Sequence, residues 1–346
     1  MIDHERVLGV LLGTAIGDAI GLPYEGLSPA RVERRIARQG LLRHSLVFGR
    51  GMISDDTEHA CMVARALVIS QGEPVRFRRA LAWRLRWWLL ALPPATGLAT
   101  ARGILRLWLG WSPERSGVDS AGNGPMMRAA LIGAFAREDR ELLKLIAAST
   151  RITHRDPRAE QAALAIARFA RSPQSRQSPA DVIAQIDDLE LRARARQALA
   201  AALDGASLAE FRATLGFARG VTGFVNDTLP AVVYCWLRWP DDPRAAIEAA
   251  IRLGGDTDTV AAIVGALAGA RLGAAALPHD WIAGIRDWPV NVALLHRLAD
   301  ALVDPRVDPR SSVARTPRPR VLASVVRNLA LLGVVLGHAL ARGFGR

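Results

Sequence analysis

The spacing of apolar positions is helical along most of the chain. Residues 7–20 are apolar and small, and Gly13 and Gly17 leave room for another backbone to approach closely. Gly21 and Pro23 follow this run, and both residue types end helices. No stretch of useful length alternates with the two-residue period of a β-strand. Because Ala and Leu, both strong helix formers, dominate the composition, we expect an all-α fold.

The same reasoning predicts the order of the remaining helices. Proline, glycine and polar capping residues separate the apolar runs. A loop within the domain is expected at 172–180, because helical patterning continues on both sides of it. The further helices are expected at about 28–38, 54–72, 75–92, 100–109, 125 onward, 138–150, 158–170, 181–215, 223–239, 243–253 and 260–272, with a last pair of core helices at 281–303.

The C-terminal part of the chain has a different composition. Residues 304–319 contain four prolines and several arginines, and they predict a linker between a domain at 1–303 and an apolar, basic helix at 320–346. The apolar run at 329–340 is short for a membrane span. Three interpretations remain open for this tail: a helix docked on the domain, a helix that binds a partner or a second copy, and an anchor at a membrane surface.

Two acidic stretches each stand at the start of a helical pattern. The first is Ser54-Asp55-Asp56-Thr57-Glu58, and the second is residues 254–259, with the sequence GGDTDT. Ser, Thr and Asp are common N-caps, and acids in a first turn suit the helix dipole. A cap requires one or two such residues, however, and the same surplus occurs twice.

The surplus points to metal binding. Ser54, Asp55, Asp56, Asp256, Asp258 and Thr259 together offer four carboxylates and two hydroxyls. Four negative charges near one point repel strongly unless a cation offsets them. Oxygen ligands suit Mg²⁺ or Mn²⁺, whereas zinc prefers His and Cys. The pattern therefore predicts a pair of Mg²⁺ or Mn²⁺ ions between the two helix starts.

Other polar residues are candidates for the same site. Glu25 lies in the loop after the first helix, where it could act as a general acid or base or as a plain surface residue. Asp18 lies in an apolar stretch, so it needs a partner in the site or a helix to cap. The glycine-rich turn at 120–124 precedes a helix and could bind an anion. His154 could contact a sugar or base, or serve a structural role.

Composition narrows the remaining possibilities. The formal charge is +12, and Lys144 is the sole lysine, so the basic side chains are almost all arginine. We find no base-stacking platform, zinc-finger spacing or glycine-phosphate fingerprint, and nucleic acid is not an expected partner. Cys61 and Cys235 stand in apolar helical contexts and are expected to be core residues. The N-terminus does not open a signal peptide, so a cytoplasmic location is expected.

Taken together and in this order, the motifs resemble those of the ADP-ribosylglycohydrolase family over roughly residues 5–300. The motifs are residues 13–21 (GTAIGDAIG), Tyr24-Glu25, Ser54-Asp55-Asp56-Thr57, residues 122–128 (GNGPMMR), Thr153-His154 and residues 254–259. The resemblance implies an orthogonal multi-helix bundle with a binuclear Mg²⁺ or Mn²⁺ site. It also implies hydrolysis of the bond between ADP-ribose and a protein side chain, often arginine.

The resemblance also implies roles for individual residues. Ser54 stands where many members have Thr, and it keeps the hydroxyl. The tail lies outside the family pattern. The implied metal ligands are Ser54, Asp55, Asp56, Asp256, Asp258 and Thr259; the implied catalytic residues are Glu25, Asp56 and Asp256; and the implied substrate contacts are Gly122, Asn123, Gly124, Met127 and His154.

Two alternatives to arginine-linked hydrolysis stay open. One is a protein on the same scaffold that binds ADP-ribose without catalysis. The other is a hydrolase of a different conjugate, linked through serine or O-acetyl groups. ADP-ribosylated protein is the expected partner and ADP-ribose the expected product, with contact to a membrane or another protein through the tail still open.

Overall fold

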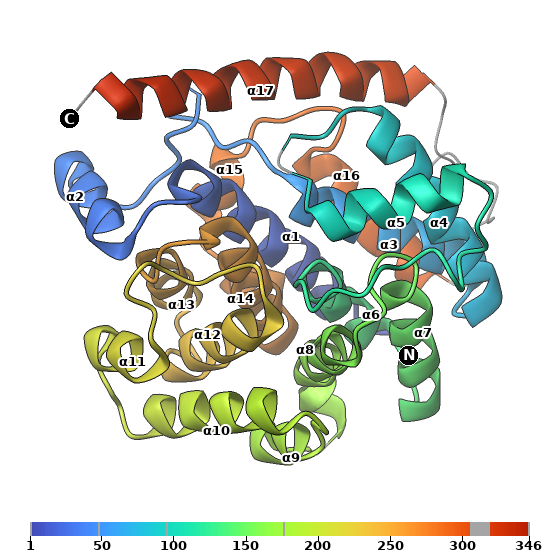
Figure 1. The fold of residues 1–346 in the computed structure, drawn as a ribbon, viewed down its shortest axis with the longest axis horizontal. Coiled ribbons are helices and arrows are strands. Elements are labelled where there is room, and N and C mark those ends of the chain that lie inside the picture. Colours follow the sequence, from blue (N-terminus) through green and yellow to red (C-terminus); the bar gives the residue numbers. More distant parts are fainter. Residues whose placement is uncertain (1, 48, 95, 176, 305–318, 345–346) are drawn as a thin grey trace.

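The centre of the fold is a pair of helices whose backbones touch. A computed structural model describes residues 2–47, 49–94, 96–175, 177–304 and 319–344. Helix α1 (His4–Gly21) packs along α14 (Thr257–Leu272), and both are buried over nearly their whole length (Figure 1). A Cβ atom on Gly13 would lie 2.0 Å from the carbonyl oxygen of Gly265. Small residues four positions apart therefore let the two helices approach at backbone distance.

The other helices surround this pair. Helices α3 and α16 pack against α1, while α8, α12 and α13 pack against α14. Among the described residues, paired backbone segments occur as isolated bridges, and the helical prediction is confirmed. The remaining helices are α2 (Pro29–Gln39), α3 (Asp55–Ser70), α4 (Pro74–Leu90), α5 (Leu98–Trp108), α6 (Ala129–Phe135), α7 (Asp139–Thr150), α8 (Pro157–Ser175), α9 (Pro179–Ala184), α10 (Leu189–Leu203), α11 (Leu208–Leu215), α12 (Val225–Arg238), α13 (Pro243–Arg252), α15 (His279–Gly284), α16 (Val292–Val303) and α17 (Pro319–Phe344), with short 3₁₀ turns at Leu22–Tyr24, Met126–Arg128 and Ala274–Ala276.

One loop prediction is wrong in part. The loop expected at 172–180 begins later, because α8 continues to Ser175. The earlier turns of α8 pack against α6 and α14, and tertiary packing contributes more to helix stability than local propensity does. The predicted linker lies almost wholly in residues 305–318, outside the described part of the chain.

The tail helix α17 runs along one edge of the molecule (Figure 1). Its Arg327, Asn328 and Leu331 are each at most 2% exposed, so the described part of the helix is docked on the domain. Within the described residues, one segment, His4–Tyr24, has the length and hydropathy of a membrane span. It lies entirely inside the fold, as expected for a core helix.

Candidate active site

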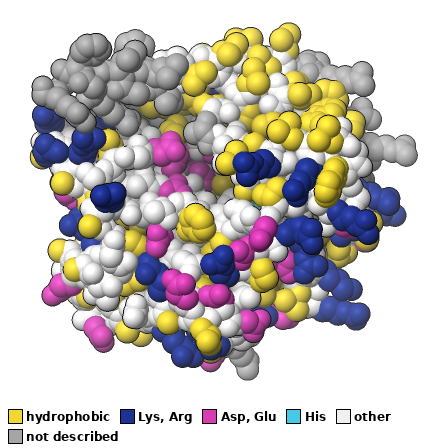
Figure 2. Space-filling view, in the orientation of Figure 1, with side chains coloured by type: hydrophobic (Ala, Val, Ile, Leu, Met, Phe, Trp, Pro, Cys, Tyr) yellow, Lys and Arg dark blue, Asp and Glu magenta, His cyan; other side chains and the backbone are white. Residues whose placement is uncertain are grey.

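The two acidic stretches meet at one cavity. Helices α3 and α14 begin next to each other, and the Thr259 hydroxyl donates a 3.2 Å hydrogen bond to Asp56 Oδ2. The cavity in front of them has a volume of about 610 Å³, which lies in the usual range for a ligand site. Figure 2 shows acidic side chains gathered in a hollow on the face seen in Figure 1. Two segments about 200 residues apart thus form one carboxylate-rich floor.

Asp18 caps the first of these helices. Its carboxylate accepts 2.9 Å hydrogen bonds from the Ser54 backbone N–H, and further bonds from the N–H and the hydroxyl of Thr57, at 3.1 and 2.5 Å. Because Asp18 serves the first turn of α3, capping does not account for Asp55 and Asp56. The expectation that Asp18 has a partner at this site or caps a neighbouring helix is thereby met.

The second stretch also has acids beyond its capping needs. Asp256 stands at the N-cap position of α14, but its side chain makes no capping hydrogen bond. Instead, Asp256 Oδ2 accepts a 2.7 Å hydrogen bond from the Asn123 side-chain amide, which also donates to the Thr228 hydroxyl. Asn123 therefore orients Asp256 at the cavity.

Backbone pairing fixes the Glu25 loop to the second acidic stretch. The Gly26 N–H donates to the Gly255 carbonyl, and the Gly255 N–H donates to the Leu27 carbonyl, both at 2.8 Å. Gly255 has a φ of +78°, and a Cβ there would lie 2.0 Å from the Val221 carbonyl oxygen, so a side chain does not fit. This pairing holds Glu25, which is half-buried, at the same cavity as Asp258.

Burial and mutual repulsion make it costly to ionise the acids of the cavity floor, namely Asp55, Asp56 and Asp258. Burial raises the pKa of Asp55 well above its usual value, and the charges of Asp18, Glu58 and Glu25 add to the shift. The pKa of Asp56 is likewise well raised, first by burial and then by Asp55. For Asp258, burial and then Glu25 have the same effect on the pKa. Ionising all of these acids requires a compensating positive charge.

The donor set fits a hard cation. Asp56 Oδ1 is buried without a hydrogen-bond partner, although buried carboxylate oxygens are normally satisfied. In the described part of the chain, no group of three or more His, Cys, Asp or Glu side chains lies close enough together to hold a metal ion. Carboxylate and hydroxyl oxygens nevertheless line the floor from both stretches. The chemistry of these donors therefore suits Mg²⁺ or Mn²⁺.

The glycine-rich turn and His154 form another part of the cavity lining. A Cβ on Gly122 would lie 2.9 Å from His154 Nε2, so the turn passes close over the imidazole. Two N–H groups of the turn are used within the protein: Gly122 donates to the Ser120 hydroxyl, and Asn123 to the Gly223 carbonyl. In this part of the cavity, a bound ligand would meet the glycine backbone of the turn and the imidazole of His154.

Buried Arg128 stabilises this region through hydrogen bonds to the segment before His154. Its guanidinium donates to Ser149 and to the Thr153 hydroxyl, and it lies 3.1 Å from His59 Nδ1. The Thr153 hydroxyl in turn lies 2.9 Å from His154 Nδ1. Burial, with the charge of Arg128, lowers the pKa of His154 to about 3, so the imidazole is neutral at physiological pH.

Most predicted site residues line the cavity. Asp56 is the exception: it is 0% exposed and lies beneath the floor, against Ser54 and Thr259. The apolar lining from α5 and from the tail was not predicted from the sequence, because helical periodicity does not say what an apolar face touches. The predicted residues at the cavity are Glu25, Ser54, Asp55, Gly122, Asn123, Gly124, Met127, His154, Asp256, Asp258 and Thr259, and further lining residues include Leu22, Leu98, Thr100, Ser120, Leu331 and Leu332.

Comparison with known proteins places this geometry in a family. The ADP-ribosylglycohydrolase family model matches residues 2–311. The chain is 26% identical to ADP-ribosyl-[dinitrogen reductase] glycohydrolase of Rhodospirillum rubrum, a match that covers 87% of this chain and 96% of that protein. It is 28% identical to ADP-ribosylarginine hydrolase Tri1 of Pseudomonas putida, with 88% and 80% covered.

A solved structure supports the same relationship. The fold resembles a chain of an ADP-ribosylglycohydrolase-related protein complex with a TM-score of 0.60 and 27% sequence identity. The match covers 86% of this chain and 97% of that chain. The all-α prediction and the sequence resemblance therefore agree with an independent comparison of folds.

Proposed function

The chain belongs to the ADP-ribosylglycohydrolase family of hydrolases, and we propose that its substrate is ADP-ribosyl-arginine in a protein. The observation that carries the proposal is the meeting of both acidic stretches and Glu25 around one cavity. The arginine linkage is supported by the similarity to a relative described as an ADP-ribosylarginine hydrolase, over 88% of this chain.

Six side chains are proposed to hold two divalent cations. Bound Mg²⁺ or Mn²⁺ would neutralise the floor and supply Lewis-acid chemistry toward hydroxyl and water oxygens. Asn123, through its bond to Asp256, fixes one ligand in position before any ion binds. The ligands are Ser54, Asp55, Asp56, Asp256, Asp258 and Thr259.

The remaining residues bind the substrate and handle protons. The ADP-ribose moiety would lie along Gly122, Gly124 and Met127, with His154 as a neutral hydrogen-bonding partner. In the reaction, a water oxygen forms a bond to the anomeric carbon while the bond from that carbon to the arginine nitrogen breaks. The half-buried carboxylate of Glu25 takes one proton from the water and passes it to the arginine nitrogen whose bond to the ribose breaks, so that the freed arginine regains its N–H group and the carboxylate is restored. Positive charge develops on the anomeric carbon and the ring oxygen of the ribose, as in other glycoside hydrolyses.

The test is a substrate panel with the full chain. Proteins or peptides ADP-ribosylated on arginine or serine, and O-acetyl-ADP-ribose, are incubated with Mg²⁺ or Mn²⁺ or with EDTA, and released ADP-ribose is quantified. We expect cation-dependent release from the arginine conjugate, and loss of release in Asp55→Ala and Asp256→Ala variants. Release from a different conjugate would reassign the acceptor.

The alternative of a binding protein without catalysis is tested by the same material. It requires ADP-ribose or its conjugates to bind to the full chain while release is absent with every substrate and cation. That result, with cation binding shown by calorimetry, would overturn the proposed activity.

A further inference from the structure

The tail helix α17 forms part of the wall of the candidate active site. Leu331 and Leu332 line the same cavity as Glu25 and Asp55. Leu331 is 1% exposed and packs with Leu22, which begins the 3₁₀ turn before Glu25. The helix therefore lies over the loop that carries the proposed proton-handling residue.

A buried ion pair fixes α17 next to the first acidic stretch. Arg327 donates to both carboxylate oxygens of Asp287, at 3.0 and 2.5 Å, and the two side chains are 2% and 1% exposed. Arg327 also donates to the Ile53 carbonyl, and the Ile53 N–H donates to Asp287 at 2.9 Å. Since Ile53 directly precedes Ser54, the tail is fastened to the backbone that leads into the metal-binding stretch.

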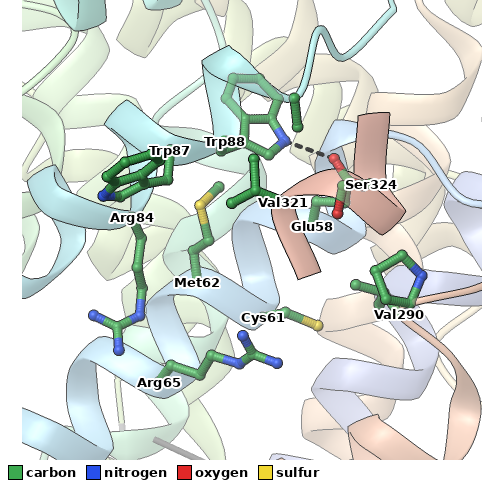
Figure 3. Close-up of a pocket in the computed structure, with 12 residues that line it drawn as sticks. Glu58, Cys61, Met62, Arg65, Arg84, Trp87, Trp88, Val290, Val321 and Ser324 are labelled. Carbon is green, nitrogen blue, oxygen red and sulfur yellow. Dashed lines mark hydrogen bonds between the residues drawn. The ribbon is translucent and has the colours of Figure 1, made fainter. Parts of the chain in front are cut away.

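Further contacts hold the start of the helix. The Asn328 amide donates a 2.8 Å hydrogen bond to the Ala91 carbonyl. Val321 and Ser324 cover a small cavity of about 90 Å³ between α3 and α4 (Figure 3). In the same cavity lining, the Trp88 indole N–H donates to Glu58 at 2.6 Å (Figure 3). These contacts support a fixed position for the helix.

The lining contributed by α17 differs from the rest of the cavity. Leu331 and Leu332, with Leu22, Pro94 and Leu98, form an apolar part of the lining. The carboxylates and the glycine turn form the polar part, which suits the sugar and the phosphates. Leu332 is 41% exposed, so it stands at the mouth rather than in the interior. The helix itself lies outside residues 2–311, which the family model matches.

We propose that α17 selects the acceptor by narrowing the entrance, so that ADP-ribosyl-arginine on an extended peptide enters and the same group on a folded protein surface is hindered. Leu332 is the specificity-determining residue, and Arg327 is a positioning residue that holds the helix. The apolar lining also suits the aliphatic part of an arginine side chain. This inference rests on the proposed function of the same cavity.

The test compares Leu332→Ala with Leu329→Ala in the full chain. Both positions lie on the exposed side of α17, and Leu329 is 53% exposed and stands outside the cavity lining. One protein ADP-ribosylated on a single arginine is used folded and as the proteolytic peptide that carries the same group. We expect Leu332→Ala to raise the ratio of kcat/KM for folded protein over peptide by about fivefold or more.

Two measurements accompany this ratio. The Kd for free ADP-ribose should be the same in the native chain and in both variants, because the sugar and phosphate contacts are unchanged. Leu329→Ala should leave the kcat/KM ratio unchanged. An unaltered ratio in Leu332→Ala, or an equal rise in both variants, overturns the inference.

The activity of the native chain shows whether the proposed function fails independently of the inference about α17. If it releases ADP-ribose from neither form of the substrate, that function is wrong. The entrance is then judged by binding, from the Kd of the folded protein relative to that of the peptide. An equal Kd ratio in the native chain and in Leu332→Ala overturns the inference, and a ratio shifted toward the folded protein supports it.

Discussion

Asp18 Oδ2 lies 2.5 Å from the hydroxyl of Thr57, which is 39 residues further along the chain. Both side chains are fully buried, and Asp18 also accepts the backbone N–H groups of Ser54 and Thr57. One carboxylate at the end of α1 therefore holds the first turn of α3, where the acidic stretch begins. The position of Asp55 depends on this contact between two helices.

Replacing Thr57 tests that dependence. Thr57→Val removes the hydroxyl and leaves Asp18 with one fewer donor, so we expect a loss of about 1–3 kcal/mol in the free energy of unfolding. Turnover should fall as well, because the start of α3 is less well held. Thr57→Ser keeps the hydroxyl and is the control for urea unfolding and activity. A loss in Thr57→Ser as large as that in Thr57→Val would show that the loss is not specific to the hydrogen bond from the hydroxyl.

The contact between the two central helices makes a second prediction. In Gly13→Ala, the new methyl group would lie 2.0 Å from the Gly265 carbonyl oxygen, which belongs to a rigid backbone. We expect the unfolding free energy to drop by at least about 2 kcal/mol. Gly333→Ala in α17 is the control, since no atom lies within 4 Å of the place that its new methyl group would take. That variant should be neutral or more stable by up to about 1 kcal/mol in urea unfolding.

The raised pKa values of the floor predict how stability varies with pH. In the unfolded chain Asp has a pKa of about 3.9, whereas Asp55, Asp56 and Asp258 have well-raised pKa values in the fold. Without divalent cations, stability is therefore highest below about pH 4 as far as these groups are concerned. Their contribution is lost as pH rises through the folded values.

Urea unfolding in EDTA between pH 4 and pH 8 measures this contribution. Asp258→Asn should reduce the fall in stability with rising pH, because one of the repelling charges is gone. Adding Mg²⁺ or Mn²⁺ to the native chain should stabilise it most at the upper end of the range. Matching pH dependences for the native chain and Asp258→Asn would contradict the prediction.

The anchor of α17 predicts a contrast between buried and exposed ion pairs. Arg327→Met leaves the Asp287 carboxylate buried without its partner, and we expect a cost of about 3–5 kcal/mol. Arg252→Met removes a surface pair with Glu33, whose side chain is 45% exposed, and should cost at most about 1 kcal/mol. The denaturant midpoints of the two variants, each compared with that of the native chain, measure the two losses of stability. A loss of stability in Arg327→Met as small as that in Arg252→Met would show that the ion pair with Asp287 does not hold α17 in place.

For His154, the predicted dependence of stability on pH has the opposite sign. Its pKa is lowered to about 3 in the fold, whereas an unfolded histidine binds a proton below about pH 6.5. The stability that His154 contributes is therefore present above pH 6.5 and is lost as pH falls toward 3. His154→Gln should be less sensitive to acid between pH 7 and pH 5 in urea unfolding. An unchanged acid sensitivity would mean that other groups account for it.

Most helix positions could be predicted from the sequence, and so could most of the residues that line the candidate site. The glycine spacing of residues 7–20 identified a close-packed helix, and the surplus of acids beyond capping needs identified both helix starts as candidate site segments. These signals are local, because the 3.6-residue period and the chemistry of a helix N-terminus depend only on residues within a few turns of one another.

The tertiary structure decided which of these segments meet. The sequence left open whether Asp18 joins the site or caps a helix, and whether the tail docks on the domain or binds a partner. Packing of α1 against α3 brings Asp18 to Thr57, and the pair of Arg327 and Asp287 brings Leu331 to the cavity. A periodic apolar face shows that a helix must be covered, but its partner follows from shape and burial over the whole chain.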